Sequence, residues 1–129
     1  MLLLDTDILI DCLRGVPAAR TWLESAAAEA FGIPGIVAME LLVGCRNQSE
    51  QQRVQKFLTV YPLLWPDASE FARAYELLAA HRLATGVGIP DCVIAAMALA
   101  RHTTLCTFNR KHFQIFAGLE VREPYQRSR

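Results

Sequence analysis

The sequence predicts an α/β fold, a three-layer α/β/α sandwich built around a mostly parallel central sheet. Short apolar segments, each typical of a buried strand, alternate with longer segments of helical spacing along the chain. This alternation favours a parallel sheet with helices on both faces. The stretch 92–100 adds a second observation, because none of its nine side chains is charged or carries an amide or hydroxyl group. A helix without a polar face is buried, and this one is too short to cross a bilayer.

The first half of the chain is expected to form two strands and four helices. The first strand is the apolar run 1–4, which ends at Asp5 and Asp7 and so has polar groups at its carboxyl end. The second strand, 30–33, is ended by Pro34 and Gly35. Helices are expected where apolar residues recur at helical spacing, at 8–13, 17–29, 36–45 and 48–58.

The second half is expected to add the apolar helix, two other helices and three strands. Asp67 and Glu70 have capping-box spacing, so a helix is expected from Asp67 to Gly86. The apolar helix follows, with Asp91 at its start after Pro90. The remaining elements are strands at 60–65 (weakened by a proline), 103–107 and 119–121, and a short helix at 108–113.

Length and composition indicate one domain over residues 1–129, with a polar tail at 122–129 that is expected to fray. Hydrophobic residues make up 53% of the chain and charged residues 20%, which excludes a disordered protein. So much apolar surface on a small body predicts a partner or a homodimer. The formal net charge is +0, so no bulk field attracts nucleic acid or a membrane.

The cysteines and the amino terminus indicate a reducing compartment. The four cysteines lie far apart and form no C-x-x-C pair, which argues against a zinc site or a redox motif. The first residues lack a basic start and are interrupted by Asp5, unlike a signal peptide. A cytoplasmic protein without membrane attachment is therefore expected.

Three carboxylates stand where a sequence that only builds a core would not place them. Asp5 ends the first strand, Glu40 interrupts an apolar helix, and Asp91 opens the apolar helix 92–100. Asn109 is a further polar residue, two positions after the strand end at Thr107. In a parallel sheet, ligands bind outside the carboxyl ends of the strands, which is where this pattern places polar groups.

Each carboxylate also has a purely structural interpretation. Asp5, Asp7 or Asp91 can cap the helix that follows. Glu40 is harder to explain, because a glutamate buried among apolar residues must be paired, protonated or metal-bound, although Arg46 is an available partner.

The joint interpretation is a metal site. Two carboxylates about 4 Å apart repel by roughly 4 kcal/mol at an effective dielectric constant of 20. Converging acids would therefore protonate unless a cation held them. Ligation by oxygen alone suits Mg²⁺ or Mn²⁺, and such an ion activates water for attack on a phosphodiester.

Four motifs in order carry a resemblance to a known family. They are Asp5-Thr6-Asp7 after an apolar strand, the segments 38–44 (AMELLVG) and 91–98 (DCVIAAMA), and the segment 105–113 (LCTFNRKHF). Together, over residues 1 to about 121, they resemble PIN-domain proteins, and within these the VapC-type toxins of bacterial toxin–antitoxin pairs.

The resemblance implies an α/β/α sandwich with a Mg²⁺- or Mn²⁺-dependent endoribonuclease site. Asp5, Glu40 and Asp91 would be the catalytic, metal-binding carboxylates. The fourth acidic position of the family falls on Asn109, a neutral residue that can orient water or phosphate. Asp7 stands where the family often has a small uncharged polar residue, so it can restore the missing charge.

The resemblance also assigns supporting residues and partners. Thr6 would support the end of the first strand, and Thr107 would fix the last loop. The expected partners are a VapB-type antitoxin whose C-terminal segment covers the site, an RNA substrate and a second copy of the chain. The basic residues that are candidates for contacts with RNA phosphates are Arg14, Arg46, Arg82, Arg110, Lys111 and His112, of which His112 better fits a structural role.

Other functions stay open at this point. A PIN-fold binding module without activity is consistent with Asn109 in place of an acid. A haloacid-dehalogenase-type phosphatase would use Asp5 and Asp7, but it also needs a late lysine and a paired-aspartate loop. A receiver domain needs a lysine before a late proline, which the sequence lacks.

Overall fold

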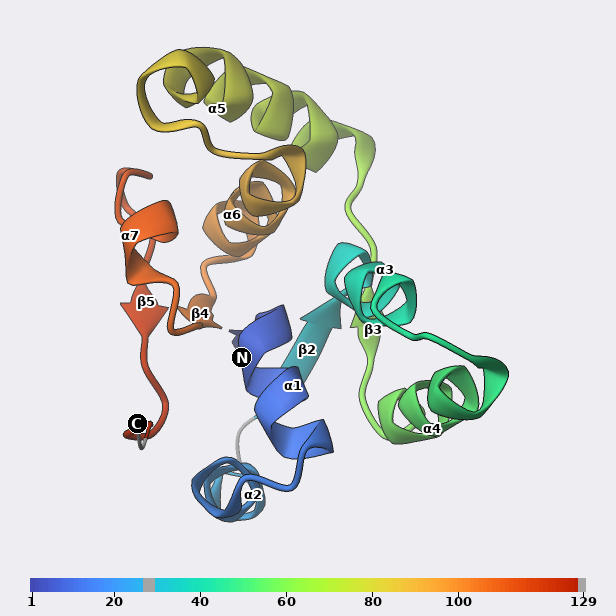
Figure 1. Cartoon of the computed structure of the whole chain (residues 1–129). Helices are drawn as coiled ribbons and strands as arrows, with labels where there is room; N and C mark the ends of the chain where they lie inside the picture. Colours follow the sequence, from blue (N-terminus) through green and yellow to red (C-terminus); the bar gives the residue numbers. More distant parts are fainter. Residues whose placement is uncertain (27–29, 128–129) are drawn as a thin grey trace.

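The computed structural model describes residues 1–26 and 30–127. Its centre is a five-stranded sheet in the order β3-β2-β1-β4-β5, and every neighbouring pair of strands is parallel (Figure 1). The strands are β1 (Leu2–Leu4), β2 (Phe31–Pro34), β3 (Leu63–Leu64), β4 (Thr104–Cys106) and β5 (Val121–Arg122). The predicted parallel sheet is thus confirmed, although β3 is much shorter than the 60–65 expected for it.

Seven helices flank the sheet in the described part of the chain. They are α1 (Thr6–Leu13), α2 (Pro17–Ser25), α3 (Gly35–Val43), α4 (Gln48–Leu58), α5 (Ala68–Thr85), α6 (Ile89–Arg101) and α7 (Arg110–Phe113). In Figure 1, α5 and α6 lie together at the top of the view, and α2 lies at the bottom. The helix expected over 17–29 ends at Ser25, and residues 27–29 lie outside the described part.

β1 is the middle strand of the sheet and has a paired strand on each side. Leu3 is paired with Gly32 of β2 on one side and with Leu105 of β4 on the other. From β1, the sequence order of the strands runs through β2 to β3 on one side of the sheet, and the later strands β4 and β5 lie on the other side. The direction of the strand order therefore reverses between β1 and β4. In open parallel sheets, the carboxyl end of such a reversal point is where ligands bind.

The apolar helix is buried as predicted. In α6, every residue from Cys92 to Ala98 is at most 2% exposed. α6 packs along α5, and the two are tied by Arg101, whose guanidinium donates two hydrogen bonds to the Glu70 carboxylate at 2.8 and 2.9 Å. Its Nη2 also donates to the Trp65 carbonyl at 2.9 Å, so one guanidinium joins α6, α5 and the loop before α5.

The capping box at the start of α5 is also confirmed. The Asp67 side chain accepts from the Glu70 amide at 2.8 Å, and the Glu70 side chain accepts from the Asp67 amide at 2.9 Å. The buried face of α5 carries Glu70, Ala74 and Leu77.

The start of α3 depends on a glycine. A Cβ placed on Gly35 would lie 2.2 Å from the Trp65 ring, so only glycine lets the ring lie against this turn. The contact fixes how α3 leaves the end of β2. It therefore also fixes the direction of Glu40, five residues further along the helix.

The carboxyl-terminal segment is anchored up to Arg127, where the sequence predicts a frayed tail. The Tyr125 hydroxyl donates to Asp11 Oδ2 at 2.7 Å, and the Arg127 guanidinium binds both carboxylate oxygens of Asp11 at 3.0 and 3.1 Å. The polar tail thus finds polar partners on α1. Residues 128–129 lie outside the described part.

Candidate functional site

The candidate site is an open pocket of about 380 Å³ at the carboxyl ends of β1 and β4. Segments far apart in the sequence meet there: the β1–α1 junction, α3, the first turn of α6, the loop after β4, and the tail. The residues that line the pocket are Asp5, Thr6, Asp7, Ile10, Glu40, Asp91, Phe108, Asn109 and Arg127. The structure therefore brings together the three predicted catalytic carboxylates, Asn109, Thr6 and Asp7.

Asp5 is the most buried of the carboxylates that line this pocket, with 8% of its surface exposed. It is the N-cap of α1, and its Oδ1 accepts a hydrogen bond from the Thr6 amide at 2.8 Å. Its Oδ2 accepts from the buried Thr107 hydroxyl at 2.8 Å. Burial raises the pKa of Asp5, these two hydrogen bonds oppose the rise, and the nearby Asp91 adds to it. The capping interpretation of Asp5 is therefore correct, and one carboxylate both caps the helix and faces the pocket.

Asp7 bridges the β1 end to the loop after β4. Its Oδ1 accepts from the Ile8 amide at 2.9 Å, and its Oδ2 accepts from the Phe108 amide at 2.8 Å. Burial and the negative charge of Asp5 raise the pKa of Asp7 to about 6. Asp7 therefore titrates near neutral pH when no cation is bound.

Asp91 lies in the first turn of α6 but does not cap it, because the N-cap is Gly88 and no side chain bonds that helix start. The capping interpretation of Asp91 is therefore wrong, and its carboxylate is free to face the pocket. His112 Nδ1 lies 3.5 Å from Asp91 Oδ2 and 2.9 Å from Asn109 Nδ2. Burial raises the pKa of Asp91, and His112 opposes the rise. His112 thus orients two residues of the site, in line with the structural role expected for it.

Glu40 differs from its sequence-based interpretation. It lies on the exposed face of α3 beside Met39, instead of being buried among apolar residues. It is not paired with Arg46 either, because the Arg46 Nε lies 2.9 Å from Glu50. Partial burial at the pocket edge raises the pKa of Glu40, as do the charges of Asp5 and Asp91, whereas Thr6 opposes the rise. These effects, together with the shared pocket lining, indicate that Glu40 faces the same space as the two aspartates.

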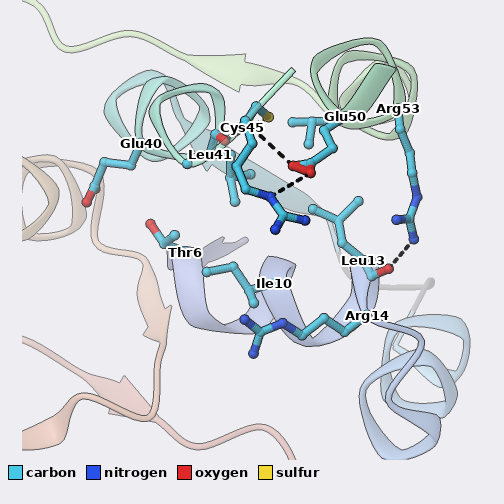
Figure 2. A pocket seen from close by; sticks show the side chains of 12 residues that line it. Thr6, Ile10, Leu13, Arg14, Glu40, Leu41, Cys45, Glu50 and Arg53 are labelled. Carbon is cyan, nitrogen blue, oxygen red and sulfur yellow. Dashed lines mark hydrogen bonds and ion pairs between the residues drawn. The ribbon is translucent and has the colours of Figure 1, made fainter. Parts of the chain in front are cut away.

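Thr6 stands between these carboxylates. Its Oγ1 is buried and faces the Glu40 carboxylate, whose pKa it lowers (Figure 2). Thr6 thus links the end of β1 to the carboxylate on α3.

The donor set fits a hard divalent cation. All candidate ligands are carboxylate or amide oxygens. Burial raises the pKa values of Asp5, Asp7, Glu40 and Asp91, and the charge of a neighbouring carboxylate adds to the rise at the first three. Within residues 1–26 and 30–127, no three carboxylate, cysteine or histidine side chains stand close enough together to enclose a metal ion. Mg²⁺ commonly binds one or two carboxylates and keeps several waters, so the open pocket suits it better than a closed cage would.

A second pocket, of about 460 Å³, adjoins the first and shares Thr6, Ile10 and Glu40 with it. It lies between α1, α3 and α4, and Figure 2 shows Glu40 and Thr6 at one end and Arg53 at the other. Arg14, Arg46 and Arg53 line it. Arg53 donates a hydrogen bond to the Leu13 carbonyl and so joins α4 to α1 (Figure 2). The acidic pocket thus continues into a groove with basic side chains.

The predicted basic residues divide into two groups. Arg14 and Arg46 line the second pocket. The others line neither pocket: Arg82 binds the carbonyls of Gly86 and Val87, Arg110 lies 4.0 Å from Glu123, and Lys111 is exposed on α7.

Arg53 and Arg127 are the basic residues that the sequence analysis missed. Arg53 follows helical spacing like any surface residue of α4, and Arg127 lies in a polar tail without a motif. No local pattern identifies either of them, because their positions depend on contacts with distant segments.

Comparison with known proteins agrees with the geometry. The family model of the PIN domain matches residues 2–119. The chain is 32% identical over 121 residues to ribonuclease VapC10 of Mycobacterium tuberculosis, covering 93% of this chain and 91% of the relative. It is 34% identical over 128 residues to ribonuclease VapC19 of the same organism, covering 93% and 98%.

Solved structures give the same result. VapBC2 from Rickettsia felis, bound to a DNA fragment from its promoter, matches with a TM-score of 0.80 at 25% identity over 94% of this chain and 96% of that one. A toxin–antitoxin complex from Klebsiella pneumoniae matches with a TM-score of 0.76 at 30% identity over 98% and 99%. The phosphatase alternative also requires a lysine, and none lines the acidic pocket among the described residues. The chain belongs to the PIN-domain family, in its VapC group.

Proposed function

We propose that this protein is a metal-dependent endoribonuclease and the toxin of a toxin–antitoxin pair. The observation that carries the proposal is that Asp5, Glu40 and Asp91, from three separate elements, line one pocket. There Asp91 raises the pKa of Asp5, and both aspartates raise the pKa of Glu40. Such repulsion between carboxylates is more typical of functional sites than of core packing. The names of the VapC relatives support RNA as the substrate.

Asp5, Glu40 and Asp91 would hold Mg²⁺ or Mn²⁺ in the acidic pocket, one or two of them directly and the rest through the waters that the ion keeps. When bound, the ion would supply an activated water and would stabilise negative charge on the phosphate. Thr107 and the Thr6 amide hold the Asp5 carboxylate in place through its two hydrogen bonds. Since both bonds favour the ionised form, they keep Asp5 available as a ligand.

Asn109 and Asp7 share the role of the fourth acid. Asn109 is held by His112 and would orient water or a phosphate oxygen rather than bind metal tightly. Asp7 would supply the missing negative charge, although both of its oxygens accept backbone hydrogen bonds. The pocket would therefore hold its ion mainly through the other three carboxylates.

RNA would reach the pocket along the adjoining groove. Arg14 and Arg46 line that groove and are placed to bind phosphates beside the acidic pocket. Arg82, Arg110 and Lys111 are less suitable, because none of them borders either pocket. Sequence preference of the cleavage would depend on base contacts in this groove.

The expected partners are a VapB-type antitoxin and a second copy of the chain. Structures of VapBC and other toxin–antitoxin complexes match this fold, which supports an antitoxin partner. We expect the C-terminal segment of that antitoxin to cover the pocket. Exposed apolar side chains on α5, including Phe71, Tyr75 and Leu83, support a homodimer. Light scattering of the antitoxin-free protein should give twice the mass of the chain, and a monomer at micromolar concentration would contradict the dimer. Within the described residues, no helix is long and apolar enough to cross a membrane.

The test is cleavage of single-stranded RNA by the antitoxin-free protein. The wild type, Asp91→Ala and the control Glu76→Gln are compared with Mg²⁺, with Mn²⁺ and with EDTA. Glu76 is an exposed acid on α5 and lines neither pocket, so its variant removes a carboxylate without touching the site. We expect cleavage by the wild type and the control that requires metal, and none by Asp91→Ala.

Two results would contradict the proposal. Cleavage that survives both EDTA and Asp91→Ala would show that the activity in the preparation needs neither a metal ion nor Asp91, against the proposed site. Titration calorimetry that finds no Mn²⁺ binding, together with no cleavage, would favour the inactive PIN-fold module, for which Asn109 is the supporting observation.

A further inference from the structure

The carboxyl-terminal segment brings an arginine to the acidic pocket. After β5 the chain turns back over α1, where Tyr125 and Arg127 both bind Asp11. Tyr125 also packs edge-on against Phe108, with ring centroids 4.9 Å apart. The segment is therefore fastened both to α1 and to the loop after β4, and these are the two elements that supply Asp5, Asp7 and Asn109.

Arg127 is held rigidly by two groups. Its Nε and Nη2 donate to the two oxygens of Asp11, and its guanidinium carbon lies 4.4 Å from the centroid of the Phe108 ring. This fork-like pairing and the stacked ring fix the plane of the guanidinium. Nη1 donates to no partner within residues 1–26 and 30–127, and 43% of the side chain remains exposed.

Arg127 is also the one cationic side chain that lines the acidic pocket in the described part of the chain. The other lining residues include four carboxylates, which would repel a polyanion. The basic residues of the adjoining groove line a pocket that Arg127 does not border. α7 carries Arg110 and Lys111, but neither of them lines the acidic pocket. Among the described residues, Arg127 is therefore the arginine or lysine that a phosphate inside this pocket would meet.

We propose that Arg127 binds a phosphate of the RNA at the edge of the acidic pocket, and that Asp11 and Phe108 hold its guanidinium in place for this purpose. The proposal rests on the proposed ribonuclease function. Arg14 and Arg46 would hold the strand on one side of the reacting phosphodiester, and Arg127 would hold it on the other. A guanidinium fixed in advance loses less freedom when it binds phosphate than a free surface side chain would.

The test compares four variants of the full-length, antitoxin-free protein: Arg127→Gln, Arg127→Lys, Tyr125→Phe and Arg73→Gln. Binding of a short fluorescein-labelled single-stranded RNA of mixed sequence is followed by anisotropy at several salt concentrations. EDTA is present, so that cleavage does not interfere. Arg73 is an exposed arginine of α5 that lines neither pocket, and it is the matched control for loss of one positive charge.

We expect Arg127→Gln to bind roughly tenfold more weakly, since it loses one charge-assisted contact. The slope of log affinity against log salt should fall by about 0.7, the value for one phosphate contact on a single strand. Arg127→Lys should restore the slope without the full affinity, because lysine keeps the charge and loses the fork. Arg73→Gln should stay near the wild type, and Tyr125→Phe, which loses one hydrogen bond to Asp11 but keeps Arg127 and its charge, should lose clearly less affinity than Arg127→Gln. In Mn²⁺, the loss of cleavage by Arg127→Gln should fall mainly on KM.

Three results would overturn the proposal: Arg127→Gln behaving like Arg73→Gln, Tyr125→Phe losing as much affinity as Arg127→Gln, or a wild type that does not bind the RNA. The second would mean that the tail only stabilises the fold. A wild type that binds RNA in the predicted way but never cleaves it would refute the ribonuclease function and leave Arg127 as a phosphate-binding residue.

Discussion

The Thr107 hydroxyl donates a 2.8 Å hydrogen bond to Asp5 Oδ2, joining two residues that are 102 positions apart in the sequence. Thr107 is fully buried, and its oxygen also accepts a hydrogen bond from the Asn109 amide at 3.0 Å. One hydroxyl thus holds the most buried carboxylate of the pocket and the start of the loop that carries Asn109. The ends of β1 and β4 are locked together at the site.

Replacing this hydroxyl should impair both stability and activity. Thr107→Val keeps the shape of the side chain but leaves Asp5 and the Asn109 amide each short of a partner. We expect a loss of about 1–3 kcal/mol in the free energy of unfolding, measured with urea. RNA cleavage should fall as well, because Asp5 loses a hydrogen bond that favours its ionised form. Thr107→Ser should recover most of both, and a Thr107→Val protein with wild-type stability would contradict this account.

The stability of the metal-free protein should decrease as the pH rises. Burial raises the pKa of Asp7 from 3.8 to about 6, so the folded state holds its proton more tightly than the unfolded state does. This contribution is fully present below pH 3.8 and is lost as the pH rises through about 6. The loss for this group is of the order of 2–3 kcal/mol. Asp5, Glu40 and Asp91 are shifted in the same direction.

Thermal unfolding at several pH values checks this expectation. Asp7→Asn should flatten the fall in melting temperature between pH 4 and 7. Mn²⁺ should raise the melting temperature most at the upper end of this range, where the carboxylates are ionised and repel each other. A wild-type melting temperature that increases steadily from pH 4 to 7 without metal would refute the prediction.

The Glu70–Arg101 ion pair should be worth far more than the surface pairs. Glu70 is 3% exposed, and it also closes the capping box of α5. Glu70→Ala leaves the Arg101 charge without its partner, so we expect a loss of about 3–5 kcal/mol in urea unfolding. The guanidinium lowers the pKa of Glu70, so its contribution should be present above pH 4.5 and fade as the pH falls further. Glu76→Gln, which breaks an exposed pair with Arg73, should change stability by less than about 1 kcal/mol.

The glycine at the start of α3 should tolerate no side chain. Gly35→Ala would place a methyl group 2.2 Å from the Trp65 ring, and we expect a loss of about 1–3 kcal/mol. The ring is the obstacle, so the same substitution in a Trp65→Ala background should cost much less. Gly44→Ala at the other end of α3 is the control, because a methyl group there meets nothing closer than 3.6 Å. Equal losses at the two glycines would contradict the assigned role of Trp65.

Local patterns were sufficient to predict much of the fold. The uncharged run in α6 and the capping box of α5 depend only on neighbouring residues, and both are confirmed. β3 was overestimated, because only Leu63 and Leu64 pair with β2, and Pro62 before them has no backbone N–H to donate. Parallel pairing follows from the βα alternation, which is visible in the sequence, whereas the strand order β3-β2-β1-β4-β5 was not predicted from it.

The site was predicted less completely, for two physical reasons. Glu40 was expected to be buried because its helix is apolar almost throughout, yet Met39 and Val43 of that helix are 51% and 86% exposed. Apolar composition does not tell which face a helix buries. Arg127 could not be found at all, because its position depends on Asp11, 116 residues away.

The position of β1 in the middle of the sheet has a consequence for synthesis of the protein on the ribosome. Asp5 is made first, but its neighbours in the pocket come from residues 40, 91 and 107–109, and β1 lacks one of its two flanking strands until β4 has emerged. A nascent chain that ends before Thr104 therefore has neither the Thr107 bond to Asp5 nor Asn109. The pocket of this ribonuclease is thus assembled only after β4 and the loop that follows it have been synthesised.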